Sequence, residues 1–194
     1  MLMERILGAL TFKNTVYKEV EEDTSFASSA WLIVAVASFL NALGTNSVLL
    51  SVRGFFPWIF GTLVDTLFKV AAFAVACFVI DIVGRTFFNA QTSFDELQRT
   101  LGLAYVWTAI GFLSIISIVG PVLGCAVGLF QFAAAIAGFV AWLYAAKEAL
   151  DLEWPQVFGT VAIGWLVLLL VGLVAGAIRG IFGLTAGVVR GIFN

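Results

Sequence analysis

The chain contains no histidine and little charge: Asp, Glu, Lys and Arg make up 11% of its 194 residues. The absence of histidine excludes imidazole proton transfer, Ser–His and Cys–His nucleophile pairs, and metal sites with histidine ligands. Ten basic and twelve acidic residues give a net charge of −2, so no basic surplus is present to neutralise nucleic-acid phosphates. We therefore expect no nucleic-acid partner.

Other reactive groups are also scarce. Cys77 and Cys125, the two cysteines, both lie in apolar runs, where a small buried thiol is the usual state. Glycine-rich phosphate loops and cysteine pairs at metal-ligand spacing are absent. Glu148, Asp151 and Glu153 could bind a hard cation weakly, but such groups more often form a solvated loop. We expect no catalytic residue, no cofactor, no metal and no enzymatic activity.

Apolar residues, by contrast, make up 62% of the chain, against about 45–50% in an ordinary soluble domain. A membrane helix needs about 20 mostly apolar residues to cross a hydrocarbon core about 30 Å thick. Five such runs lie between charged and turn residues, at 27–50, 58–80, 101–119, 122–146 and 157–178. The sequence therefore predicts an all-α, polytopic bundle of five transmembrane helices.

This bundle forms one of three expected parts of the chain. Residues 1–26 are predicted to be a cytoplasmic amphipathic lead-in, 27–178 the five-span membrane domain, and 179–194 a Gly-rich C-terminal tail. In the lead-in, Phe12 and Val20 lie at helical spacing with Val16 between them. The segment is either an amphipathic helix lying at the interface or a connector packed on the ends of the bundle.

Several helix ends are marked chemically. Ser93, with Glu96 three residues later, predicts a capping box that opens the third helix. Gly120 and Pro121 end the third helix and begin the fourth, because proline cannot continue a helix but fits its first position. Spans three and four should form a tight helical hairpin.

The distribution of basic residues predicts the orientation. With a cytoplasmic N-terminus, three basic residues lie outside, namely Arg53, Arg179 and Arg190. Six then lie in the cytoplasm, namely Arg5, Lys13, Lys18, Arg85, Arg99 and Lys147. We expect the N-terminus in the cytoplasm and the C-terminus outside.

Asp65 and Lys69 are the most distinctive polar feature, because they lie four residues apart near the middle of the second span. An unpaired charge there costs about 2.5–3.5 kcal/mol on insertion scales, so a pair on one helix face is expected. The pair is either a structural bridge inside the bundle or part of an ion or proton pathway. Asp81 lies about 120° around the helix from Lys69 and is not expected to join it.

Two other patterns concern contacts between helices. Intramembrane polar residues usually hydrogen-bond between spans; they are Asn41, Thr108, Ser114, Ser117 and Gln131. Small residues at four-residue spacing let helix backbones approach closely. The candidate packing glycines are Gly120, Gly124 and Gly128 in the fourth span and Gly172, Gly176 and Gly180 at the end of the fifth. They predict packing within the bundle or contact with a partner.

Four segments together resemble the Yip domain family, integral membrane proteins that interact with Ypt/Rab GTPases. They are the lead-in with Phe12 and Tyr17, the polar link 88–94 (FNAQTSF), the segment 97–105 (LQRTLGLAY), and 145–149 (AAKEA) at the end of the fourth span. The resemblance implies a bacterial-type member with five spans and a cytoplasmic N-terminus. It implies no enzymatic activity and transfers no catalytic residue.

The sequence thus favours a non-enzymatic adaptor, scaffold or accessory subunit of the cell membrane. Its expected partners are membrane lipids and other integral membrane proteins or a second copy of itself. The alternative is a small channel or transporter that uses Asp65 and Lys69. A water-lined cavity that reaches Lys69 would favour transport, whereas a dry, closed salt bridge would count against it.

Overall fold

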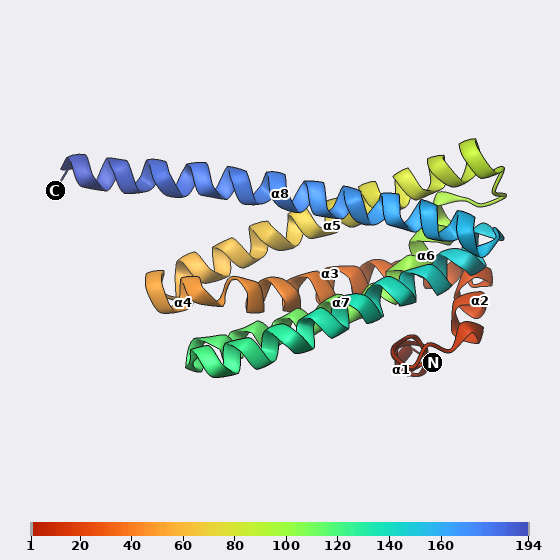
Figure 1. The fold of residues 1–194 in the computed structure, drawn as a ribbon, viewed down its shortest axis with the longest axis horizontal. Helices are drawn as coiled ribbons and strands as arrows, with labels where there is room; N and C mark the ends of the chain where they lie inside the picture. Colours follow the sequence, from red (N-terminus) through yellow and green to blue (C-terminus); the bar gives the residue numbers. More distant parts are fainter. Residues whose placement is uncertain (1, 194) are drawn as a thin grey trace.

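The computed structural model describes the backbone of residues 2–193, and the side chains of these residues except 121, 175 and 178–193. It is 91% helical and has no strand in the described part of the chain. Five segments are long and apolar enough to cross a membrane: Thr24–Thr45, Phe55–Phe88, Phe94–Val119, Val122–Leu150 and Trp154–Val174 (Figure 1). The predicted all-α, five-span fold is confirmed.

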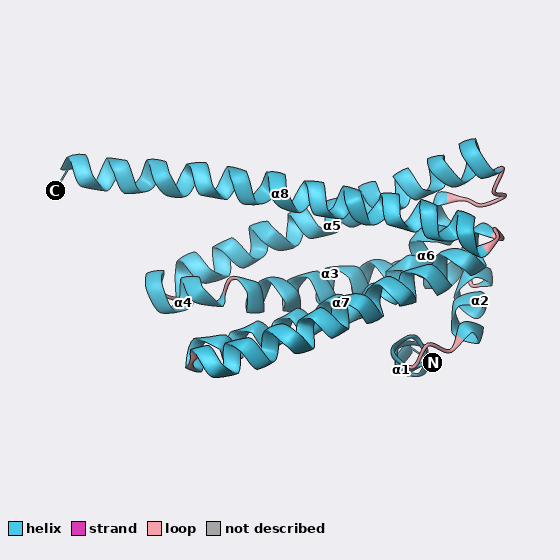
Figure 2. Cartoon of the chain, in the orientation of Figure 1, coloured by secondary structure: helices cyan, strands magenta, loops and turns pink. Residues whose placement is uncertain are grey.

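The first span is shorter than predicted, because Asn46 interrupts it. The short 3₁₀ turn η1 (Thr24–Phe26) leads into α3 (Ala27–Thr45), and a separate short helix, α4 (Ser47–Arg53), follows (Figure 2). The Asn46 side chain donates to the carbonyl oxygen of Ala42 at 3.0 Å and so binds the end of α3. Gly54, with φ of +87°, then turns the chain into the next span.

The second span, α5 (Phe55–Phe88), extends beyond the predicted 58–80 at both ends. An ion pair between Asp81 and Arg85, four residues apart, lies in its last turns. The pair stabilises the helix beyond the end of the apolar run. Asn89, in the left-handed region at φ of +54°, ends it. The predicted capping box of Ser93 and Glu96 is confirmed at the start of α6 (Phe94–Ala104).

The third span changes helix type at Tyr105, where α6 continues as the 3₁₀ helix η2 (Tyr105–Val119). Side chains three residues apart align along a 3₁₀ helix. The sequence places a polar residue or glycine at every third position here: Tyr105, Thr108, Gly111, Ser114 and Ser117. A rise of about 2.0 Å per residue also lets this short segment cover nearly the hydrocarbon thickness.

The last two spans are α7 (Pro121–Leu150) and α8 (Trp154–Phe193). A turn at Gly120 joins η2 to α7, and the two helices pack along each other, so the predicted hairpin is confirmed. Helix α8 packs on α5, and its backbone remains helical through the predicted tail as far as Phe193 (Figure 1). Away from their junction at 151–153, α7 and α8 diverge (Figure 1).

The lead-in consists of two helices, α1 (Leu2–Leu10) and α2 (Asn14–Glu22), rather than one amphipathic helix over residues 12–20. Phe12, at the bend between them, stacks on Trp107 with ring centroids 5.5 Å apart. Val16 and Val20 are buried in the core. The segment therefore packs on the end of the bundle, and its position at the membrane interface stays a prediction.

Short loops place α1, α2, the start of α3, the link between α5 and α6 and the junction of α7 and α8 at one end of the bundle. Helix α4 and the turn between η2 and α7 lie at the other end (Figure 1). The six basic residues counted as cytoplasmic belong to the first end, and Arg53 belongs to the second. This agrees with the predicted sidedness of the loops. Which end faces the cytoplasm stays a prediction.

Close packing of α3 on η2 depends on two glycines that the four-residue pattern did not single out. A Cβ atom on Gly44 would lie 2.1 Å from the carbonyl oxygen of Gly111. A Cβ atom on Gly111 would lie 1.9 Å from Nδ2 of Asn41. The two backbones therefore meet directly, as is common where membrane helices associate.

We predict that Gly44→Ala lowers the free energy of unfolding by about 1–3 kcal/mol, because the added methyl group must push η2 away. The matched control is Gly128→Ala in α7, where a Cβ atom meets nothing within 4 Å. That variant should gain about 0.5–1 kcal/mol from its better helix propensity. Thermal unfolding of the detergent-solubilised chain measures both. Equal changes in the free energy of unfolding of the two variants would contradict the close approach of α3 to η2.

Several acidic residues lie near Glu21, at the end of the bundle that carries α2. Burial raises the pKa of Glu21 to about 7, and the nearby carboxylates of Asp151, Glu96, Glu148 and Glu22 add to the shift. Arg99, which is buried, donates to the carbonyl oxygens of Val20 and Glu21 at 3.2 and 2.5 Å and so fixes α2 on α6. The folded chain therefore disfavours the ionised form of the Glu21 carboxyl.

Stability should therefore fall as the pH rises from about 4.5 to about 7. In that window the folded chain keeps the Glu21 proton, because its pKa lies above the ordinary value of 4.5, whereas the unfolded chain loses it. Glu21→Gln should remove most of this pH dependence. It should also raise the free energy of unfolding at about pH 8 by about 1 kcal/mol, a value discounted for solvent screening. Thermal unfolding against pH tests this, and an unchanged profile would contradict it.

A candidate intramembrane binding site

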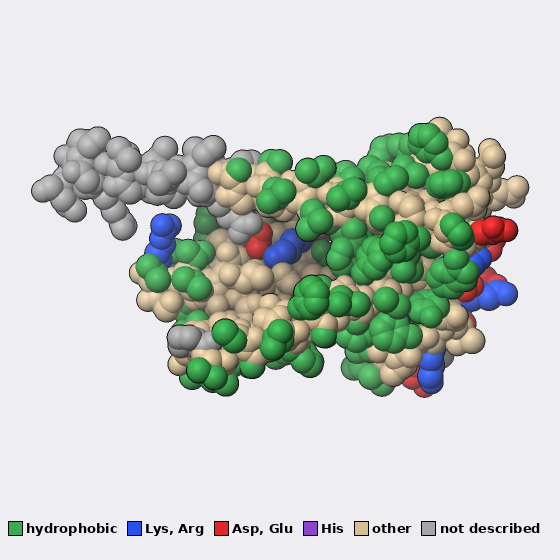
Figure 3. All heavy atoms as spheres, in the orientation of Figure 1, with side chains coloured by type: hydrophobic (Ala, Val, Ile, Leu, Met, Phe, Trp, Pro, Cys, Tyr) green, Lys and Arg blue, Asp and Glu red, His purple; other side chains and the backbone are tan. Residues whose placement is uncertain are grey.

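A cavity of about 560 Å³ lies between α3, α5, η2, α7 and α8. Figure 3 shows a basic and an acidic side chain together in a hollow beneath α8. Lys69 and Asp65 are the charged residues among those that line this cavity. The volume falls within the range of about 300–1,000 Å³ that is common for small-molecule sites.

Lys69 and Asp65 form the predicted ion pair on one face of α5. Nζ of Lys69 lies 2.9 Å from Oδ2 of Asp65. The same oxygen accepts a hydrogen bond from Nδ2 of Asn46 at 3.2 Å. The Asp65 side chain is only 6% exposed, whereas that of Lys69 is 26% exposed, so the ammonium is the charge presented to the cavity.

Local structure explains why these three residues meet. The i, i+4 spacing on α5 places Lys69 one turn above Asp65. The break between α3 and α4 turns Asn46 toward α5, and its amide binds both the end of α3 and the carboxylate. A buried carboxylate is costly in a membrane unless several donors satisfy it. Lys69 and Asn46 supply those donors.

Hydrogen bonds between spans form the rest of the polar wall. Nδ2 of Asn41 donates to the carbonyl oxygen of Thr108 at 2.9 Å. Nε2 of Gln131 donates to Oγ of Ser114 at 2.5 Å. Asn41, Thr108 and Gln131 also line the cavity. The predicted hydrogen bonding between spans is confirmed for the side chains of Asn41, Gln131 and Ser114, whereas Thr108 takes part through its backbone carbonyl.

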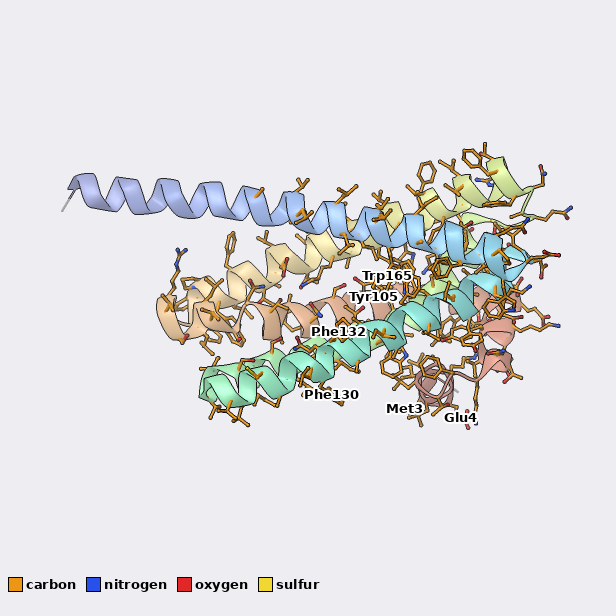
Figure 4. The ribbon with its side chains drawn as sticks, viewed as in Figure 1. Met3, Glu4, Tyr105, Phe130, Phe132 and Trp165 are labelled. Atoms are coloured by element: carbon orange, nitrogen blue, oxygen red, sulfur yellow. The ribbon has the colours of Figure 1, made fainter. Side chains whose placement is uncertain are left out.

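An aromatic cluster closes the cavity toward the end of the bundle that carries α1 and α2. Phe73, fully buried, packs on Tyr105 and Trp142 with centroids 5.1 and 6.0 Å apart. Trp142 contacts Trp165 of α8 at 6.3 Å. Figure 4 shows Tyr105 and Trp165 inside the bundle, whereas Phe130 of α7 points outward. The site therefore combines a polar wall with an aromatic end.

Most of the candidate packing glycines whose surroundings the structure describes have no close neighbour in the bundle. Among the described residues, a Cβ atom on Gly120, Gly128, Gly172 or Gly176 would meet nothing within 4 Å. At Gly124 it would make an ordinary contact with Ser117 at 3.6 Å. Packing inside the chain is therefore wrong for the first four, and a partner contact stays a prediction. The side-chain environment of Gly180 lies outside the described residues.

Several residues of the site were not predicted from the sequence, chiefly Asn46 and the aromatic residues. Asn46 lies within a run that was predicted to be one continuous helix. The three-residue spacing of Tyr105, Thr108 and Gly111 could have indicated a shared face, because it matches the period of a 3₁₀ helix. Asp81 lies apart and pairs with Arg85, as its angular position predicted.

The site offers no constellation for metal binding. No group of three or more Cys, Asp or Glu side chains that could hold a metal ion occurs in the part of the chain that the structure describes. The cavity instead presents one ammonium, several amides and hydroxyls, and aromatic walls. This arrangement suits non-covalent binding of a molecule with a polar and an apolar part.

Removal of Lys69 alone should destabilise the fold, because it leaves the buried Asp65 carboxylate without its ion-pair partner. We predict that Lys69→Met lowers the free energy of unfolding by about 2 kcal/mol, less than for a fully buried pair because Lys69 is partly exposed. Adding Asp65→Asn should recover most of the loss. Thermal unfolding in detergent distinguishes the two variants. A double variant as unstable as the single one would contradict this account of the pair.

Comparison with known proteins leaves the family open: the chain matches no family model, no curated protein and no solved structure. The resemblance to the Yip domain family therefore stays a prediction. The function of the site has to be argued from its residues, their distances and their burial.

Proposed function

We propose that this chain is a multi-pass protein of the cell membrane that binds a small molecule in the cavity between α5, η2, α7 and α8. Such binding is the step that a carrier and a membrane receptor share. The observation that supports the proposal is the position of Lys69, whose ion pair with Asp65 lies in the wall of a cavity. This favours the transport-class alternative of the sequence analysis over the adaptor.

The surroundings of the ion pair support the same proposal. A bridge needed only for stability is best placed where side chains pack tightly around it, because voids cost stability. Here the pair borders about 560 Å³ of space, together with Asn41, Thr108 and Gln131. These polar groups converge on one region, which is the usual anatomy of a binding site.

The aromatic cluster argues for a binding site over an open channel. Phe73, Tyr105 and Trp142 fill the bundle beyond the cavity, and all three are at most 6% exposed. A continuous aqueous path would have to cross this layer. The aromatic layer therefore blocks the cavity toward this end of the bundle, as in one state of a carrier.

A second candidate, the adaptor, is favoured by the glycines of α8. Gly172 and Gly176 leave backbone uncovered on a helix whose neighbouring side chains Leu169, Leu170 and Leu173 are exposed. Surfaces of this kind let another membrane helix approach closely. The two functions use different glycines. Gly172 lines the ligand cavity, whereas a surface for a partner helix would include both Gly172 and Gly176.

These two glycines supply a matched test. Gly172 lines the cavity and has room for a side chain, whereas Gly176 has room but does not line it. We predict that Gly172→Leu fills the cavity and lowers ligand occupancy at least about tenfold, a loss of about 1.4 kcal/mol in binding. Gly176→Leu should keep the wild-type occupancy. Native mass spectrometry of the chain, extracted in mild detergent, measures the mass of the bound molecule.

The alternative results are distinct. A wild-type chain that carries no added mass, or equal occupancy in both variants, would contradict binding in the cavity. A membrane protein that co-purifies with the wild type and is lost from both variants would support the adaptor instead. The unfolding temperatures of the two variants, which should match, serve as the control for stability.

A further inference from the structure

We propose that the molecule bound in the cavity is an amphiphile with an acidic head group, whose oxyanion contacts Lys69 and whose apolar chain leaves between α7 and α8. This inference rests on the proposed binding function and adds the chemical class of the ligand. It follows from the charge exposed in the cavity, the position of the polar groups, and the shape of the opening.

Lys69 is the more exposed member of the ion pair. Its side chain is 26% exposed and that of Asp65 is 6% exposed, and the Asp65 carboxylate accepts hydrogen bonds from Lys69 and Asn46. An ammonium has three N–H donors and can bind more than one oxyanion at the same time. Hydrogen bonds to charged groups are the strong ones, particularly where water is largely excluded. A phosphate or carboxylate therefore fits this position better than a neutral or cationic group.

The remaining polar groups suit the hydroxyl groups that many acidic heads carry. The amide nitrogens of Asn41 and Gln131 donate to Thr108 and Ser114, so their amide oxygens are oriented as acceptors. Thr45 likewise donates to the α3 backbone and retains acceptor capacity. The wall thus combines the Lys69–Asp65 pair with neutral acceptors, and an acidic head with hydroxyl groups can bind both Lys69 and these acceptors.

The opening of the cavity lies toward the apolar surface of the bundle. Trp142 and Trp165 hold α7 and α8 together near their junction, and farther along the cavity is lined by Leu168, Val171 and Gly172 of α8. Figure 3 shows the hollow bordered by hydrophobic side chains of α7 and α8. A ligand that enters here passes through acyl chains, so an apolar chain can stay in the bilayer while its head occupies the polar wall.

Brominated lipids test the inference, because bromine quenches the fluorescence of nearby tryptophans and Trp107, Trp142 and Trp165 line the cavity. The full chain in detergent is titrated with dibrominated phosphatidylglycerol, phosphatidylcholine and stearic acid. A parallel titration of Gly172→Leu measures quenching by lipids outside the cavity and is subtracted. We expect phosphatidylglycerol or the fatty acid to reach half-quenching at about tenfold lower concentration than phosphatidylcholine.

The two acidic probes identify the source of the oxyanion. Tighter binding of phosphatidylglycerol indicates a phospholipid phosphate, and tighter binding of the fatty acid indicates a carboxylate. Both results support the inference. Equal half-quenching by all three probes would overturn the acidic head group while leaving the proposed function intact. No quenching beyond that of Gly172→Leu with any probe would overturn the proposed function as well.

Two double variants connect the preference to the ion pair. Asp65→Asn with Lys69→Met removes the pair without leaving an uncompensated charge and should abolish the preference for acidic probes. Asp81→Asn with Arg85→Met removes the second i, i+4 pair of α5, which does not line the cavity, and should leave the preference unchanged. A preference that survives the first substitution would overturn the role of Lys69. If that variant fails to fold, the comparison of probes on the wild type still decides the inference.

Discussion

The arrangement of the bundle depends on one constraint: two opposite charges in the second span have to be satisfied away from lipid. The i, i+4 spacing of Asp65 and Lys69 satisfies them only in part, because a carboxylate has more acceptor capacity than one ammonium fills. The bundle supplies Asn46, which binds the carboxylate and ends α3 at the same time. Asn46 thus connects the break in the first span with the polar group in the second.

The same constraint shapes the functional proposal. Asp65 is buried and held by two donors, so the pair presents its cationic member to the cavity. Phe73, Tyr105 and Trp142 close one end, and the divergence of α7 and α8 opens one side (Figure 1). A polar wall reached through an apolar opening is suited to molecules that already reside in the membrane.

Much of the fold could be predicted because its signals are local. Apolar runs of membrane length identified the five spans, the Ser93 and Glu96 spacing identified a helix start, and the i, i+4 spacing identified the ion pair. The cavity could not be predicted, because it depends on which faces of five helices meet. Gly44 and Gly111 show this: neither belongs to a four-residue glycine pattern, and only the contact of α3 with η2 reveals its role.

The most direct test of the account is a density map of the full chain in lipid nanodiscs. We predict elongated density in the cavity, with its polar end at the Lys69 ammonium and its other end between α7 and α8. A map in which α8 closes against α7 and side chains fill the space around Lys69 and Asp65 would contradict the account.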